Sequence, residues 1–68
     1  MNDYDVWEFL NVHPSKREVL NTLGQPDSVW VDDQQQIEIL YYFIPRLQDY
    51  NSVELDMKTK SVTGFEWD

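Results

Sequence analysis

The residues of this chain that could do chemistry are one histidine and several closely spaced carboxylates. His13 is the only histidine, it precedes Pro14, and the chain has no cysteine and no serine nucleophile motif near it. A catalytic histidine needs a nucleophile or an orienting partner within hydrogen-bond reach. We therefore expect His13 to be a surface or packing residue.

Two carboxylate pairs are Glu54 with Asp56 and Asp32 with Asp33. On a strand, Glu54 and Asp56 would share one face, roughly 7 Å apart. General acid–base catalysis also needs a pocket that shifts one pKa, and an open sheet face offers none. The acids from Asp27 to Asp33 lack the alternating ligands, central glycine and distal glutamate of a calcium loop. We expect no catalytic, cofactor-binding or metal-binding residues, and so no enzyme.

The charge of the chain indicates the kind of partner it would bind. Thirteen acidic residues stand against five basic ones, for a net charge of −8. This balance argues against direct binding to nucleic acid, whose phosphates would be repelled. It favours a basic protein partner and salt-sensitive association. The alternative is that the acidic surface only keeps the protein soluble.

Size and hydropathy bound the architecture and the location. The 68 residues form one domain, 1–68, and ten aromatic residues strengthen a core that no disulfide supports. No run approaches the roughly 18 apolar residues of a membrane span. The N-terminus lacks the basic start and apolar core of a signal peptide. We expect a cytoplasmic protein without membrane contact, or a periplasmic one if a leader has been removed.

The clearest local pattern is the run from Ser15 to Leu23, which predicts a helix with both ends marked. Ser15 and Glu18 have the spacing of a capping box. Gly24 follows the last helical residue, where a positive φ is expected, and Pro26 blocks continuation.

Residues Asn2 to Leu10 predict another short helix. Asn2 or Asp3 can cap it, and Tyr4, Trp7 and Leu10 recur at helical spacing. The alternation of polar and apolar residues here is also compatible with an edge strand.

Four later segments predict strands, separated by the turns Asp32–Gln35 and Lys58–Lys60 and the loop Arg46–Asn51. The strand segments are Ser28–Val31, Ile37–Ile44, Val53–Met57 and Val62–Trp67. Val62 and Phe65 are three residues apart, so both face the core only if Gly64 marks a β-bulge.

These elements predict an α+β fold, with two short N-terminal helices packed on one face of a three- to four-stranded antiparallel meander sheet. We expect Ile39, Phe43 and Leu55 to be among the most buried residues. The face expected under the helices consists of Ile37, Ile39, Tyr41, Phe43, Val53, Leu55 and Met57.

The opposite face is the predicted binding site, because aromatic anchors with a charged rim are typical of protein-binding patches. Its expected residues are Trp30, Glu38, Leu40, Tyr42, Glu54, Asp56 and Glu66. The alternatives are that an N-terminal segment or a second copy of the chain covers this face.

The order of these motifs resembles the BamE-like (SmpA/OmlA) family of small bacterial lipoproteins over roughly residues 14 to 67. The matching residues are Glu18, Val19, Leu23-Gly24-Gln25-Pro26, Tyr41-Tyr42, Val53-Glu54-Leu55 and Val62 to Glu66. The resemblance implies two helices on an antiparallel sheet and a recognition function. The sequence has no lipobox cysteine, so we carry over the fold and the binding function but not a role in outer-membrane barrel assembly.

The leading hypothesis from the sequence is a non-enzymatic, acidic protein–protein interaction module. One alternative is a small acidic inhibitor, of the toxin-immunity or phage anti-defence type, that blocks a basic nucleic-acid-binding site. A second alternative is a structural homodimer.

Overall fold

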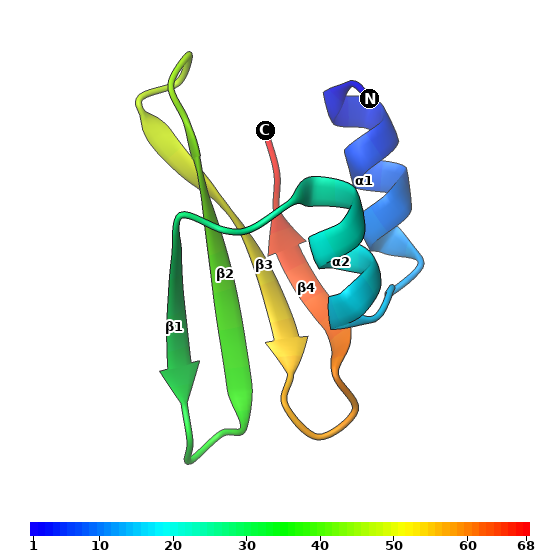
Figure 1. The fold of residues 1–68 in the computed structure, drawn as a ribbon, viewed down its shortest axis with the longest axis vertical. Helices are drawn as coiled ribbons and strands as arrows, with labels where there is room; N and C mark the ends of the chain where they lie inside the picture. The colour runs from blue at the N-terminus through cyan, green and yellow to red at the C-terminus, as the bar shows by residue number, and fades with distance from the viewer.

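The fold consists of two helices followed by a four-stranded sheet, in a computed structural model that describes all 68 residues (Figure 1). Neighbouring strands along the chain pair antiparallel, in the order β1-β2-β3-β4. The predicted α+β class and antiparallel meander are confirmed, with four strands. The elements are α1 (Asp3–Asn11), α2 (Lys16–Leu23), β1 (Ser28–Asp32), β2 (Ile37–Ile44), β3 (Asp49–Asp56) and β4 (Ser61–Glu66).

Helix α2 has both of the predicted end signals. The Ser15 hydroxyl oxygen accepts from the Glu18 amide at 3.2 Å, and the Ser15 amide donates to the Glu18 carboxylate at 3.1 Å. At the other end, Gly24 has a φ of 86°. Because these contacts are local, the sequence alone predicts this helix correctly.

Helix α1 begins with a second capping box. The Asn2 side chain accepts from the Asp5 amide at 2.8 Å, and the Asn2 amide donates to the Asp5 carboxylate at 3.1 Å. Asn2 is therefore the cap, and the alternative of an edge strand is wrong for this segment.

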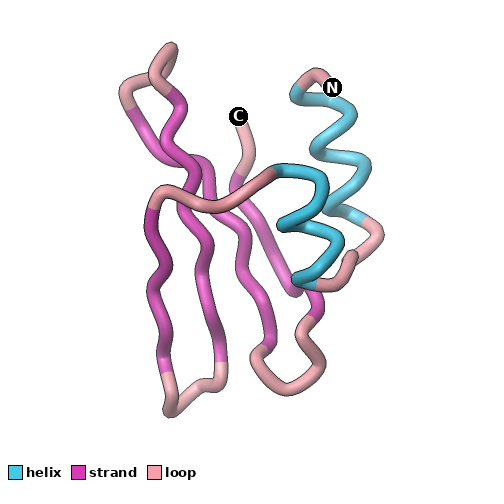
Figure 2. The backbone as a smooth tube through the Cα atoms, viewed as in Figure 1, coloured by secondary structure: helices cyan, strands magenta, loops and turns pink.

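Three connections of the same length join the strands (Figure 2). They are residues 33–36, 45–48 and 57–60, and each ends in a residue with a left-handed backbone: Gln36, Gln48 and Lys60. The loop predicted over Arg46–Asn51 is wrong in its extent, because β3 begins at Asp49. The length of a hairpin loop sets which residues of its two strands lie opposite each other.

A buried cluster joins helix and sheet residues in one core. Val6, Leu10 and Val19 come from the helices, and Leu40, Tyr42, Val53, Leu55 and Val62 come from the sheet. We call the sheet face that carries these residues the core face, and the opposite side the open face. Neither helix has the length or the apolar character that a membrane crossing requires.

The predicted bulge in the last strand is present. Leu55 pairs with Val62 but Glu54 pairs with Gly64, so Thr63 is the extra residue. The shift lets Val62 be buried while Phe65 still packs on the helix side, with its ring 5.1 Å from that of Trp7. Gly64 therefore marks the bulge, as its position in the sequence indicates.

The predicted core of β2 is wrong. Leu55 is 1% exposed as expected, but Phe43 is 38% exposed and Ile39 only partly buried. Leu40 and Tyr42 take their place in the core, because Leu40 lies opposite the buried Val53. Of the face expected under the helices, only Val53 and Leu55 belong to the buried cluster; Ile37, Ile39, Tyr41 and Phe43 belong to the open face.

Candidate protein-binding face

The open face is built from residues that lie opposite one another on neighbouring strands. Trp30 of β1 pairs with Ile39 of β2, and Ile39 pairs with Glu54 of β3. In the next rows, Tyr41 pairs with Ser52 and Phe43 with Tyr50. Since side chains alternate strictly between faces, these partners share one side of the sheet.

Aromatic and aliphatic side chains gather on β1, on β2 and at the start of β3. The Tyr50 ring lies edge-on to Phe43 at 5.2 Å and to Tyr41 at 6.1 Å. Trp30 is 49% exposed and Tyr50 is 51% exposed. We call this set the aromatic half of the open face: Trp30, Ile39, Tyr41, Phe43 and Tyr50.

Carboxylates occupy the β3–β4 side, which we call the acidic half: Glu54, Asp56 and Glu66. None of the four strands contains a lysine or an arginine. The two ion pairs of the protein, Lys16 with Glu38 and Arg46 with Asp3, involve none of these three acids. No lysine or arginine of the chain therefore forms an ion pair with the acidic half.

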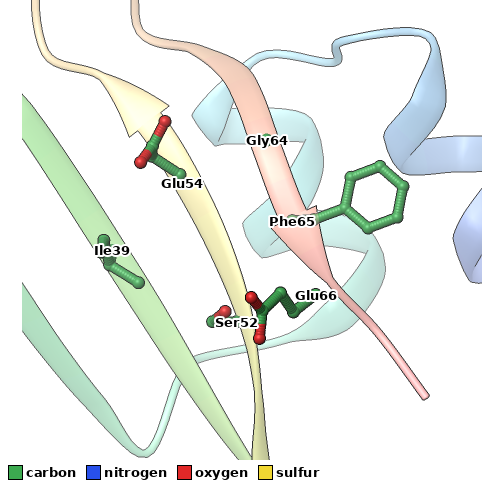
Figure 3. A pocket seen from close by; sticks show the side chains of 6 residues that line it. All are labelled: Ile39, Ser52, Glu54, Gly64, Phe65 and Glu66. Carbon is green, nitrogen blue, oxygen red and sulfur yellow. The ribbon is translucent and has the colours of Figure 1, made fainter.

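A shallow depression of about 250 Å³ lies where the two halves meet. Ile39, Ser52, Glu54, Gly64 and Glu66 line it together with Phe65, and Figure 3 shows the Phe65 ring turned away from the two glutamates. Gly64 has no side chain, so the row that begins with Trp30 ends without one, and a Cβ at Gly64 would lie 3.8 Å from the Glu54 carboxylate. The Thr63 hydroxyl donates to the Glu54 carboxylate at 2.8 Å and holds it in place.

The structure separates the seven predicted site residues into two groups. Trp30, Glu54, Asp56 and Glu66 lie on the open face as expected. Leu40, Tyr42 and Glu38 were predicted there but lie on the core face, because Leu40 is opposite Val53 and alternation places the other two on the same side.

The core-face residues have internal roles. The Glu38 carboxylate forms an ion pair with Lys16 of α2 at 3.0 Å. The Tyr42 hydroxyl donates to the Gly24 carbonyl oxygen at 2.9 Å, which ties β2 to the end of α2. Leu40 is 1% exposed. None of the three side chains can serve as an anchor on the open face.

Sequence reasoning missed four of the five residues of the aromatic half: Ile39, Tyr41, Phe43 and Tyr50. The sequence predicts the first three on the face under the helices and Tyr50 in the loop Arg46–Asn51. The missed signal was the loop Pro45–Gln48. Because this loop has an even number of residues, even-numbered residues of β2 lie opposite odd-numbered residues of β3. Val53 and Leu55 are core residues, so the even-numbered residues of β2 share the core face with them.

The residues considered for catalysis form hydrogen bonds with the backbone of the fold. Nδ1 of His13 lies 2.9 Å from the Val62 carbonyl oxygen, to which it donates, so this side chain ties the α1–α2 connection to β4. Asp32 and Asp56 accept backbone amides of the turns that follow them. No three His, Asp or Glu side chains converge in an arrangement that could hold a metal ion.

The buried Tyr42 hydroxyl should make stability depend on pH in the alkaline range. Burial raises the pKa of Tyr42 above 10.0, and the negative charge of Asp27 raises it further. The folded state then holds this proton more tightly than the unfolded state, so the stabilisation is fully present below pH 10.0 and is lost as pH rises above it.

Tyr42→Phe should therefore flatten the decline of the unfolding free energy that sets in above pH 10.0, within a measured range of about pH 8 to 11. It should also lower stability by about 0.5–1.5 kcal/mol at pH 8, through the lost hydrogen bond to Gly24. Urea titrations across this range measure both effects. Tyr4→Phe, at a position 70% exposed, is the control. An unchanged pH dependence in Tyr42→Phe would contradict the assignment.

Comparison with protein-family models, curated proteins and solved structures finds no match to this chain. The resemblance to the BamE-like family therefore stays a prediction.

Proposed function

We propose that this protein is a non-enzymatic binding module whose open face binds a basic protein partner. The observation that carries the proposal is the juxtaposition of the aromatic half and the acidic half on one sheet face. Exposed aromatic side chains supply the contact area of interface hot spots. Uncompensated carboxylates beside them attract and orient a partner of opposite charge.

In this proposal the two helices cover only the core face of the sheet. The burial of Val6, Leu10 and Val19 together with Leu40 and Val53 supports this arrangement. The exposure of Trp30, Phe43 and Tyr50 supports it from the other side, since a covered face would bury these rings. An open sheet face of this kind leaves one continuous surface available to a partner.

Paired variants test the proposal by comparing the open face with the surface of α1. Phe43→Ala removes an aromatic of the open face, and Tyr4→Ala removes an exposed aromatic of α1. Glu66→Lys and Glu8→Lys each raise the net charge of −8 by two, the first on the open face and the second on α1. Each pair thus removes comparable chemistry from two different surfaces.

The measurement is cross-linking capture from the source cells, followed by surface plasmon resonance on the recovered partner. Phe43→Ala should weaken binding by about 2 kcal/mol, chiefly through faster dissociation. Glu66→Lys should slow association, and the parent on-rate should fall roughly tenfold or more from low to high salt. Tyr4→Ala and Glu8→Lys should bind like the parent.

Loss of binding in the α1 variants alone would refute the open face as the site and move it to the helix. An on-rate that changes neither with salt nor with Glu66→Lys would refute the electrostatic part of the proposal.

The acidic-inhibitor hypothesis makes one further prediction about the same partner. If the partner uses its basic site for nucleic acid, this protein should displace a bound oligonucleotide, and Glu66→Lys should do so less well. The homodimer hypothesis predicts instead a sedimentation coefficient that rises with protein concentration in the absence of any partner.

A further inference from the structure

The two edges of the sheet differ in their protection. At the β4 edge, the chain before α2 covers the start of the strand. The Val62 amide donates to the Pro14 carbonyl at 2.8 Å, and the Lys16 amide donates to the Lys60 carbonyl at 2.8 Å. At the opposite edge, β1 is the last strand, and no segment pairs with its outer side (Figure 1).

Strand β1 lacks most of the usual devices that keep an edge from pairing, and its one charged residue is the terminal Asp32. Its sequence is Ser-Val-Trp-Val-Asp, without lysine, arginine, proline or glycine. Its pairing with β2 runs over five residues without a register shift. Edge strands of soluble proteins are normally interrupted by such residues or by bulges, because a regular exposed edge is a template for another strand.

The side chains of β1 would contact an added strand on both faces of the sheet. Trp30 is 49% exposed on the open face, and Val29 and Val31 are 48% and 44% exposed on the other side. Strand addition takes its affinity from main-chain hydrogen bonds and its specificity from alternate side chains. Apolar contacts are therefore available to both sets of side chains of an incoming strand.

The charge around β1 decides what kind of strand fits. Asp27 precedes β1, and Asp32 and Asp33 follow at its other end. No lysine or arginine occurs between Arg17 and Arg46. A second copy would bring the same acids and a second net charge of −8 to this edge, whereas a segment with lysine or arginine would be complementary.

We infer that β1 accepts an extended basic segment of the partner protein as a fifth strand of the sheet, an inference that rests on the proposed function. The added strand lies beside Trp30, so it continues the aromatic half of the open face. Main-chain pairing at β1 then positions the rest of the partner over the acidic half.

The test uses a synthetic octapeptide that alternates lysine with valine. Binding should protect β1 amide hydrogens from exchange by roughly tenfold or more, while amides of β4 stay unchanged, as measured by NMR. Two control peptides isolate the causes. One carries N-methyl groups on every backbone amide and so cannot donate hydrogen bonds along either edge, and the other has glutamate in place of lysine. Neither should bind.

Matched variants place the site on β1. Val31→Lys adds a positive charge to the edge and should weaken binding of the lysine–valine peptide at least tenfold. Val12→Lys, at a position 74% exposed outside the sheet, makes the same chemical change and should bind like the parent. A folded Val31→Lys with parental affinity would overturn the inference.

The remaining outcomes also decide the question. Equal binding of the N-methylated peptide, or no binding of the lysine–valine peptide up to about 1 mM, would overturn strand addition. A captured partner that is lost with Glu66→Lys but kept with Val31→Lys would refute strand addition and leave the proposed function standing. A partner kept with both Glu66→Lys and Phe43→Ala would refute the proposed function itself.

Discussion

Leu40→Ala should lower the free energy of unfolding by about 2–5 kcal/mol, the usual cost of truncating a fully buried leucine. Leu40 is 1% exposed and lies opposite Val53, which is completely buried. A domain of this length has a total stability of only about 3–10 kcal/mol. The variant should therefore be partly unfolded at modest urea concentrations, and urea titration followed by far-UV circular dichroism measures the loss.

Phe43→Ala is the matched comparison, because Phe43 lies on the same strand but on the opposite face. Its ring is 38% exposed and contacts Tyr50. Losing that cross-strand contact should cost only roughly 0.5–1.5 kcal/mol. A Phe43→Ala variant less stable than Leu40→Ala would mean that the two faces of the sheet are reversed, and the open face would lose its aromatic half.

Gly24→Ala should destabilise the protein by about 1–3 kcal/mol through backbone strain alone. Gly24 has φ 86° and ψ −172°, a combination essentially restricted to glycine. An added β-carbon would meet no atom within 4 Å, so steric crowding contributes nothing. Thermal and urea unfolding against the parent measure the loss.

Gln25→Ala is the control for this prediction, since it changes the next exposed position without a positive φ. It should leave stability within about 0.5 kcal/mol of the parent. Gly24 also presents its carbonyl to the Tyr42 hydroxyl. A Gly24→Ala variant as stable as the parent would show that α2 ends in some other conformation.

The stability and binding predictions are linked through the two faces of β2. The strand Ile37–Ile44 has large side chains on both sides: one set completes the core and the other forms the aromatic half. Variants of the open face should therefore bind less well yet fold almost normally. Variants of the core face should be less stable, while the fraction that stays folded binds like the parent. This separation allows function to be tested without the confusion of unfolding.

Local chemistry in the sequence determined most of the elements of this protein. The capping box of Ser15 and Glu18, the glycine after the helix and the β-branched and aromatic run of β2 all act within a few residues. For that reason α2, β2 and the bulge at Gly64 were predicted at or within one residue of their places. The overall α+β class follows from the order of these elements.

Only the tertiary structure decided which face of β2 is buried. Its sequence is apolar on both sides, so alternation alone favours neither face. The choice depends on the register with β3, which the four-residue loop Pro45–Gln48 sets, and a loop one residue longer or shorter would exchange the faces. The position of β1 at an edge follows from the meander order, whereas the covering of the β4 edge by the segment before α2 is seen only in the tertiary structure.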